Sequence, residues 1–134
     1  MERTLILIKP DGVRRNLIGE IIRRYEMKGL KIVSIKSMHP SRELVEEHYA
    51  EHRGKPFFND LIEYLTSGMV VACIVEGSNA IKCVRLINGA TKYYDALPGT
   101  IRGDFACDET QNLVHASDCE EAAKREIGLW FPEG

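Results

Sequence analysis

The uninterrupted apolar run Met69–Val75 (MVVACIV) is the feature that most constrains the fold of this chain. A short β-branched and aliphatic run of this kind is typical of a strand that is covered on both faces. It therefore predicts a central strand in a sheet with helices on each side. A length of 134 residues with 44% hydrophobic content is enough for one core, so we expect a single domain over residues 1–134.

The first forty residues predict strand, helix and strand in turn. Thr4–Ile8 is an aliphatic strand that a Lys-Pro-Asp-Gly turn ends. Apolar residues recur at helical spacing over Leu17–Met27, and Gly29 ends that helix. Leu30–Met38 alternates like a half-buried strand, with one irregularity around Val33.

Two short helices then form a predicted hairpin. Ser41 is a suitable N-cap for the first, and the second runs over Phe57–Thr66 behind a proline. Beyond the central strand, Ser78 is expected to cap a helix that ends near Ile87. The remaining expectations are a long loop over 89–111, a short segment Asn112–His115, and a last helix from a Ser117-x-x-Glu120 capping box to about Gly128.

The order of these elements predicts an α+β fold. With the helical hairpin set aside it contains βαββαβ, the arrangement of a ferredoxin-like sandwich. We therefore expect a four-stranded antiparallel sheet with helices on its faces, an inserted αα-hairpin, and a long loop before the last strand. A fold of this kind does not by itself indicate a chemistry.

Composition and missing motifs exclude several classes. A net charge of −2 argues against duplex nucleic acid and anionic membranes as partners. P-loop, GxGxxG and GxSxG motifs are absent. The cysteines at 73, 83, 107 and 119 lack metal-ligand spacing and fit free thiols in a reducing compartment. Without a secretory signal or an apolar stretch approaching about 20 residues, a cytoplasmic protein is expected.

The histidines divide into two groups. His48 and His52 are four residues apart and could bind a metal from one helix face, but no third ligand motif accompanies them, so packed or solvated side chains are favoured. His115 follows a glycine-containing loop that carries Arg102 and precedes a predicted helix start, where anions are favoured. A functional histidine and a histidine that ends an edge strand both remain open on this spacing.

The segment around His115 resembles a known family. Asn112–Asp118 (NLVHASD) is similar to the Asn-x-x-His-Gly-Ser-Asp signature of nucleoside diphosphate kinases. Further resemblances follow in the family's order along essentially the whole chain: TLILIKPDGV at 4–13, His48–Phe58, Ser67–Ala72, Pro98–Phe105 and Glu126–Phe131.

This resemblance implies a ferredoxin-like enzyme that moves the terminal phosphate between nucleotides by a ping-pong mechanism through phosphorylated His115. It implies that Mg²⁺ binds through the nucleotide phosphates and not in a protein cage. The implied substrates are ATP, GTP, other nucleoside di- and triphosphates and their deoxy forms. The implied assembly is a homo-oligomer, a hexamer in preference to a tetramer, with no membrane and no specific nucleic acid as partner.

The resemblance also assigns roles to single residues. Ser117 and Glu126 hold His115 from behind, and Asn112 with Lys9 contacts the sugar. Phe57 stacks on the base, with Leu61 beside it. The residues implied to surround the phosphates are Lys9, Tyr49, Arg85, Thr91 and Arg102. Independently, cations from three separate segments suit a transferring phosphoryl group, which spreads negative charge over its oxygens.

This chain departs from the family pattern at a few positions. Ala116 stands where a glycine is usual, and we expect it to have an ordinary φ. Lys92-Tyr93-Tyr94 replaces a proline in a region of subunit contacts, and Glu109 replaces an apolar residue near the base.

Two other functions remain open. A non-catalytic relative acting as a binding or regulatory module would lack part of the constellation, which is complete here. A ferredoxin-like RNA binder would show an aromatic sheet face and basic surroundings, whereas these strands are aliphatic.

Overall fold

The computed structural model describes residues 1–133. Its centre is a four-stranded antiparallel sheet in the order β2-β3-β1-β4. The strands are β1 (Glu2–Ile8), β2 (Lys31–Met38), β3 (Val70–Gly77) and β4 (Val114–Ala116). Because β3 pairs with both β2 and β1, the prediction that Met69–Val75 lies centrally in a sheet is confirmed.

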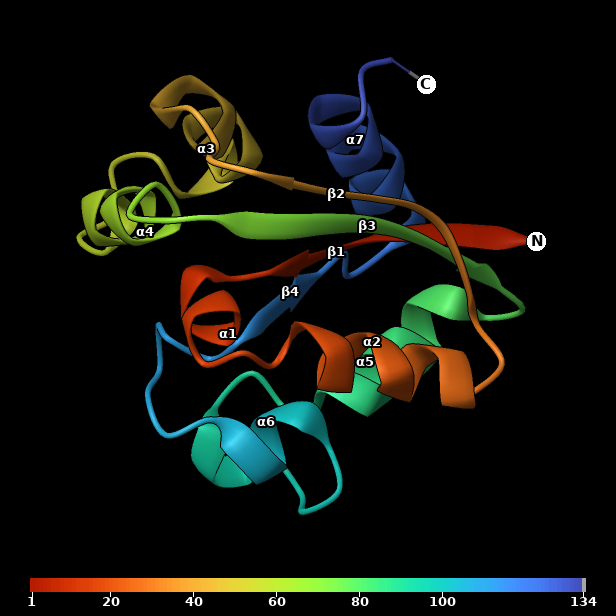
Figure 1. Ribbon diagram of the computed structural model, residues 1–134. Coiled ribbons are helices and arrows are strands. Elements are labelled where there is room, and N and C mark those ends of the chain that lie inside the picture. Colours follow the sequence, from red (N-terminus) through yellow and green to blue (C-terminus); the bar gives the residue numbers. More distant parts are fainter. Residues whose placement is uncertain (134) are drawn as a thin grey trace.

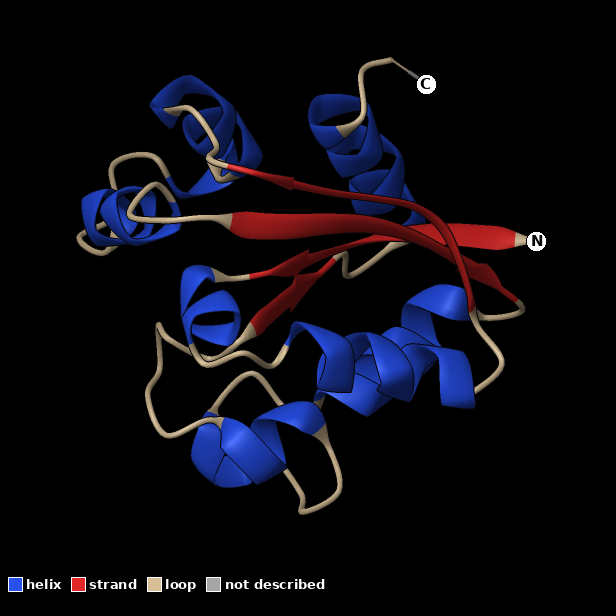
Figure 2. Cartoon of the chain, in the orientation of Figure 1, coloured by secondary structure: helices blue, strands red, loops and turns tan. Residues whose placement is uncertain are grey.

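Helices cover both faces of the sheet, as Figures 1 and 2 show. On one face lie α2 (Ile18–Met27), α5 (Ala80–Asn88) and α6 (Ile101–Phe105), and on the other α3 (Arg42–His48), α4 (Phe58–Leu65) and α7 (Glu120–Trp130). Short helix α1 (Pro10–Arg14) follows β1, and 3₁₀ turns occupy Ala50–His52 and Tyr93–Asp95. The predicted ferredoxin-like α+β sandwich with an αα-hairpin between β2 and β3 is confirmed. No helix in residues 1–133 is both long and apolar enough to cross a membrane.

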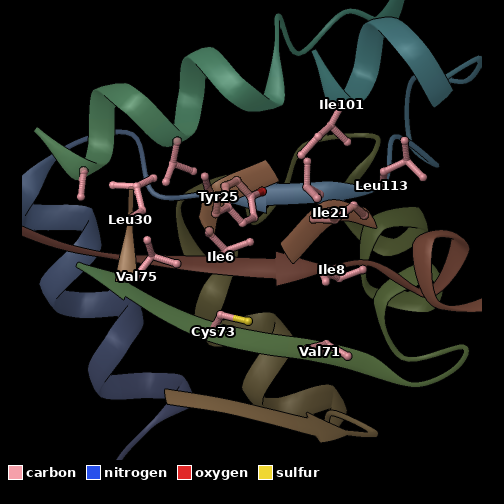
Figure 3. Packing of buried hydrophobic residues seen from close by; sticks show 14 residues of the cluster. Ile6, Ile8, Ile21, Tyr25, Leu30, Val71, Cys73, Val75, Ile101 and Leu113 are labelled. Atoms are coloured by element: carbon pink, nitrogen blue, oxygen red, sulfur yellow. The ribbon is translucent and has the colours of Figure 1, made fainter. Parts of the chain in front are cut away.

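Strand β1 supplies side chains to two cores because successive residues point to opposite faces. Ile6 and Ile8 pack with Tyr25 of α2 and Cys73 of β3, a cluster that Figure 3 shows between the sheet and the helices. Leu5 and Leu7 pack on the other face against α3, α4 and α7. The whole second half of β1 is thereby buried, and Lys9, which follows it, emerges from the interior of the molecule.

Several local predictions are confirmed. The register of β2 against β3 shifts between Ile32 and Ser34, which is the irregularity expected around Val33. The Ser41 hydroxyl accepts a hydrogen bond from the Leu44 amide and so caps α3. Gly89 ends α5 with a φ of 88°. Ala116 lies in β4 without a positive φ, as expected for an alanine in this position.

Two helices were not predicted. Helix α1 begins at Pro10, where we expected only a turn, because proline at the first helical position has its φ already set. Helix α6 lies inside the predicted loop 89–111 and begins behind Thr100, whose hydroxyl accepts from the Gly103 amide at 2.9 Å. With five residues each, neither helix gives a readable apolar period.

Two predicted caps were wrong. The side chain that caps α7 is that of Cys119, whose sulfur accepts from the Ala122 amide, while the Ser117 hydroxyl is used elsewhere. This helix also continues past Gly128 to Trp130, whose ring is buried in the second core. At α5 the N-cap position is taken by Asn79 instead of Ser78, without a side-chain cap.

Candidate active site

His115 lies in the middle of edge strand β4, where it pairs with Leu7. Its Nε2 is 2.9 Å from Oε1 of Glu126 on α7, and the Ser117 hydroxyl donates to the same oxygen at 2.8 Å. A carboxylate only accepts, so Nε2 carries the ring proton and Nδ1 keeps its lone pair. The sequence left open which nitrogen could act as a nucleophile, and this geometry indicates Nδ1.

The placement of His115 differs in part from the sequence expectation. It does not directly precede a helix, because α7 begins only at Glu120. Cys119 at the N-cap of α7 nevertheless lines the same cleft as His115. The start of this helix, with its free amides, therefore forms part of the cleft wall.

Lys9 extends from the end of β1 to the other side of the cleft. Its Nζ donates to Oδ1 of Asn112 at 2.8 Å, and the side chain is almost fully buried. Burial and the nearby Arg102 guanidinium lower the pKa of Lys9 to about 8, although Asp11 acts in the opposite direction. This ammonium is thus a cation that an anionic ligand would stabilise.

Arg102 is held by backbone carbonyls. One terminal nitrogen donates to Gly89 at 2.8 Å and the other to Val114 at 2.6 Å. Its Nε is buried without a hydrogen-bond partner in the described residues. Burial lowers its pKa, but a guanidinium remains charged in proteins. Arg102 therefore connects the end of α5 to β4 and keeps a buried charge beside His115.

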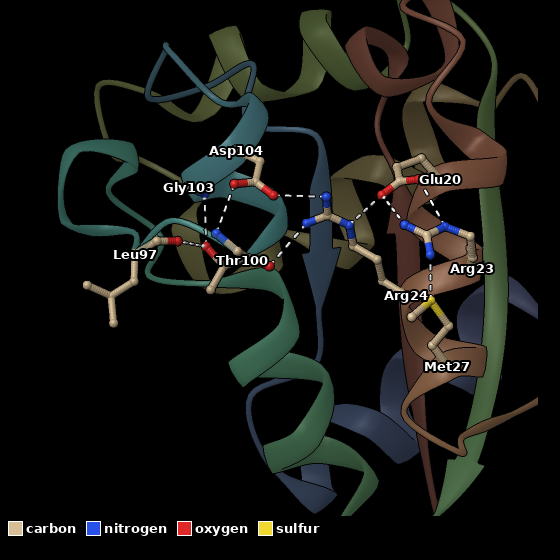
Figure 4. Close-up of polar contacts among 9 residues, drawn as sticks. Glu20, Arg23, Arg24, Met27, Leu97, Thr100, Gly103 and Asp104 are labelled. Atoms are coloured by element: carbon tan, nitrogen blue, oxygen red, sulfur yellow. Dashed lines mark hydrogen bonds and ion pairs between the residues drawn. The ribbon is translucent and has the colours of Figure 1, made fainter.

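Helix α6, which carries Arg102, is joined to α2 by an ion pair that Figure 4 shows. The Arg24 guanidinium bridges Glu20 on its own helix, at 2.7 Å, and Asp104 on α6, at 2.9 Å. Arg24 also donates to the carbonyl of Gly99 at 3.2 Å. The loop that the sequence predicted as irregular is thus a fixed platform for a cation.

A cleft of about 670 Å³ opens between these elements. Most residues that the sequence assigned to the site line it together: Lys9, Tyr49, Leu61, Arg85, Thr91, Arg102, Asn112, His115 and Glu126. Ser117 lies behind the cleft wall, buried against Glu126. Phe57 does not line the cleft; it is 45% exposed, and its ring centroid is 5.4 Å from that of His52, which does line it.

His48 is a site residue whose position the sequence did not predict. It is buried, and its Nδ1 accepts from Nε1 of Trp130 at 3.0 Å. Its ring meets the ring of His115 edge to face, with centroids 4.5 Å apart. The only sequence feature that indicated a site role for His48 was its place in the family-like segment His48–Phe58. Its helical spacing instead suggested a shared metal site with His52.

A metal site at these histidines is disfavoured by hydrogen bonding. One nitrogen of His48, one of His115 and an oxygen of Glu126 lie within 4.8 Å of one another. The indole N–H of Trp130 can only donate, however, so the proton of neutral His48 is on Nε2 and blocks it as a ligand. Glu126 is already bound to His115 and Ser117. His52 lies outside α3, with its Nδ1 3.1 Å from Nζ of Lys55.

A histidine whose Nε2 bonds a carboxylate shares its cleft with Lys9, Arg85 and Arg102, an arrangement that suits a nucleophilic imidazole beside a bound phosphoryl group. A sequence model of the family described as nucleoside diphosphate kinase matches residues 2–134. The chain belongs to the nucleoside diphosphate kinase family.

Individual relatives are similar over nearly the full length. A nucleoside diphosphate kinase of Caldanaerobacter subterraneus is 65% identical over 133 residues, which are 99% of this chain and 96% of that protein. One from Archaeoglobus fulgidus is 59% identical over 99% of this chain and 88% of its own length. A crystal structure from Babesia bovis matches with a TM-score of 0.96 at 51% identity, covering 99% of this chain and 90% of the other.

A further solved relative contains a ligand. The nucleoside diphosphate kinase of Halobacterium salinarum in complex with CDP matches with a TM-score of 0.95 at 53% identity, covering 97% of this chain and 87% of the other. Together these findings decide for an enzyme among the alternatives that the sequence left open. The chain is a nucleotide-binding phosphotransferase that moves the terminal phosphate of a nucleoside triphosphate to a nucleoside diphosphate.

Proposed function

We propose that His115 is the nucleophile of a ping-pong reaction and that Nδ1 receives the phosphate. The main support for this proposal is the hydrogen bond from Nε2 to Glu126, which leaves Nδ1 as the basic nitrogen of the ring. A nucleoside triphosphate forms the N–P bond as its own P–O bond breaks, and the diphosphate leaves. A second nucleoside diphosphate then takes the phosphate by the reverse step.

The phosphates are bound by Lys9, Tyr49, Arg85, Thr91 and Arg102. Support comes from their common place on the cleft wall and from the three cations among them. Burial raises the pKa of Tyr49, so its hydroxyl stays protonated and can donate to a phosphate oxygen. Arg102, whose terminal nitrogens already bond carbonyls and whose Nε is buried, acts mainly through its charge. These positive groups stabilise the charge of the transferring phosphoryl group.

The nucleoside lies toward the outer part of the cleft. Asn112 and Lys9 contact the sugar, a role that their mutual hydrogen bond supports by fixing one relative to the other. Phe57 stacks on the base with Leu61 beside it, and the exposed ring of Phe57 is available for this contact. An aromatic face does not distinguish bases, so ATP, GTP, other nucleotides and their deoxy forms all serve as substrates.

Mg²⁺ accompanies the nucleotide and is held by its phosphates. The grouping of His48, His115 and Glu126 is unsuited to it, since Mg²⁺ prefers oxygen ligands and these side chains already bond to one another or to Trp130. When bound, the ion neutralises phosphate charge. The protein's contribution is to position the phosphates with Lys9, Arg85 and Arg102.

The functional form is a cytoplasmic homo-oligomer, a hexamer in preference to a tetramer, in which residues 1–134 form one domain. The outer edge of β2 is unpaired within residues 1–133, and Ile35 on that strand is 53% exposed. Leu97 and Tyr94 are exposed near the 3₁₀ turn, which leaves apolar surface for contacts between subunits. All four cysteines are free, in keeping with a reducing compartment.

The test is phosphorylation by labelled ATP. The wild-type protein should form an acid-labile, base-stable phosphoprotein, and His115→Ala should form none and lose nucleotide exchange while it keeps its fold. His39→Ala is the matched control, because His39 is exposed and outside the cleft. Substantial exchange by His115→Ala would contradict the proposal.

A further inference from the structure

Leu113, two residues before His115, has an unusual backbone conformation. Its φ is 79°, a region that residues other than glycine rarely adopt, and its side chain is fully buried. Contacts on both sides hold it there. Its N–H donates to Oδ2 of Asp11 at 3.1 Å, and its carbonyl accepts from the Lys9 amide at 2.8 Å. The conformation of the segment before His115 thus depends on residues 9 to 11.

Asp11 is itself fixed by a third element. Oδ1 of its buried carboxylate accepts a hydrogen bond from the hydroxyl of Tyr64 on α4, and that hydroxyl accepts from the Asp11 amide at 2.8 Å. Burial and the neighbouring carboxylate raise the pKa of Tyr64, so the hydroxyl remains a donor. One carboxylate therefore joins α1, the helical hairpin and the turn at Leu113.

This junction lies directly behind two cleft residues. Lys9 precedes Asp11 by two positions and Asn112 precedes Leu113, and their side chains meet at 2.8 Å. Neither Asp11 nor Tyr64 lines the cleft. They can act on a ligand only through the placement of Lys9 and Asn112.

We propose that Asp11, oriented by Tyr64, is the positioning residue that sets the Lys9–Asn112 pair for the sugar hydroxyls of the nucleotide. The proposal rests on the sugar contact assigned to this pair under the proposed function. Loss of the Asp11 contacts allows the turn at Leu113 to relax and separates Lys9 from Asn112. His115 keeps its own support from Glu126 and Ser117 on the opposite side.

The experiment compares three phosphate donors in single-turnover phosphorylation of His115: ATP, 2′,3′-dideoxy-ATP and phosphoramidate. The dideoxynucleotide lacks the hydroxyls that the pair would bind, and phosphoramidate lacks the nucleoside altogether. The variants are Asp11→Asn and Tyr64→Phe, with Asp60→Asn as the matched control because Asp60 is exposed and outside the cleft.

Asp11→Asn and Tyr64→Phe should slow phosphorylation by ATP about 10- to 100-fold, by analogy with the loss of a supporting contact behind a metal ligand. Their rates with dideoxy-ATP and phosphoramidate should fall clearly less than with ATP, because these donors lose only the phosphate contact of Lys9. Asp60→Asn should match wild type with all three donors. An equal loss with all three donors would overturn the proposal, as would unchanged rates with ATP. If Asp11→Asn does not fold, Tyr64→Phe provides the test, because this variant loses only one hydroxyl.

A failure of the proposed function has a different signature. In that case the wild-type protein itself forms no phosphohistidine with any donor. A wild-type protein that reacts equally fast with ATP and dideoxy-ATP would contradict the sugar contact and with it the role of Asp11.

Discussion

The Glu126 carboxylate binds His115 and Ser117 through the same oxygen, Oε1, at 2.9 and 2.8 Å. Both donors come from the segment at β4, while the acceptor comes from α7. The carboxylate thereby fixes the tautomer and the orientation of the imidazole, and under the proposed function it would stabilise positive charge on the ring when Nδ1 attacks. Its burial keeps water from competing for these bonds.

Glu126→Gln tests this arrangement. The amide oxygen can still accept from Nε2, but the negative charge is lost, so we expect kcat to fall on the order of 10- to 100-fold with little change in the KM for nucleotides. Steady-state kinetics with several nucleotide pairs measure this split. Glu26→Gln on exposed α2 surface is the matched control, and an unchanged kcat for Glu126→Gln would remove Glu126 from the mechanism.

Arg102→Lys should affect both stability and turnover. A lysine cannot reach the carbonyls of Gly89 and Val114 together, so at least one buried acceptor is left unpaired. We expect the free energy of unfolding to fall by about 1–3 kcal/mol. Loss of the fixed guanidinium should cost turnover about 2.7–4 kcal/mol of barrier. Denaturant titration and kinetics separate the two effects, with exposed Arg14→Lys as control.

The pH dependence of kcat/KM should report Lys9. Phosphate binding needs the ammonium form, and the pKa of Lys9 is lowered to about 8 by burial and Arg102. We therefore expect kcat/KM to decline above about pH 8. Bound phosphate raises the pKa of this ammonium, so kcat should decline only at higher pH. Lys9→Met should abolish this alkaline decline of kcat/KM. A wild-type kcat/KM that stays constant up to pH 10 would contradict the assignment to Lys9.

The same shift affects stability with a defined sign. The folded pKa of about 8 lies below the ordinary lysine pKa of 10.5, so the unfolded state binds more protons between these values. The contribution of Lys9 to the free energy of unfolding therefore increases as pH rises through this window. Comparing wild type with Lys9→Met by denaturant titration at pH 7.5 and 9.5 measures it.

His48 should make the protein sensitive to acid. Burial, with His115 next in importance, lowers the pKa of His48 well below 6.5, so the unfolded state takes up this proton first as pH falls. Stability from neutral His48 is complete above pH 6.5 and decreases below it, by at most about 1.4 kcal/mol per pH unit. His48→Gln, whose amide oxygen can accept from Trp130, should show a smaller slope in thermal unfolding between pH 6.5 and 5. An equal slope would assign the effect to other groups.

Replacement of glycine by alanine is expected to lower stability at one position of the chain and to raise it at another. A Cβ at Gly103 in α6 would lie 1.8 Å from the carbonyl oxygen of Leu97, a backbone atom that cannot move independently. Gly103→Ala should cost about 3 kcal/mol of stability and lower activity through displaced Arg102. Gly128→Ala in α7 meets nothing within 4 Å and should gain about 0.5–1 kcal/mol. Thermal unfolding measures both; a Gly103→Ala variant as stable as wild type would disprove the clash.

The sequence predicted features that depend on long apolar patterns or on a single local cap. Strand β3, the helical hairpin, the irregularity at Val33 and the Ser41 cap are of this kind. It could not predict bonds that form only across the fold. Ser117 has the spacing of a capping box, yet its hydroxyl bonds Glu126, because only the tertiary structure brings that carboxylate close.

For the cleft, residue identities came from the family resemblance and their geometry from the fold. The φ of 79° at Leu113 could not be predicted from the sequence, because leucine rarely adopts this conformation. Leu113 is held in it by hydrogen bonds to Asp11 and Lys9. The exposed position of Phe57 and the contact between His48 and Trp130 were equally invisible. Each depends on residues distant in sequence.

The pairing of β4 with β1 brings the last strand of the chain beside the first, and Lys9 and Asn112 meet across 103 positions. During synthesis the ribosome therefore releases β1, β2 and β3 long before β4 and α7 can join them. A nascent chain that stops before α7 has its cations but lacks the carboxylate that orients the imidazole. Under the proposed role of Glu126, full turnover is expected only after α7 has left the exit tunnel and packed against the sheet.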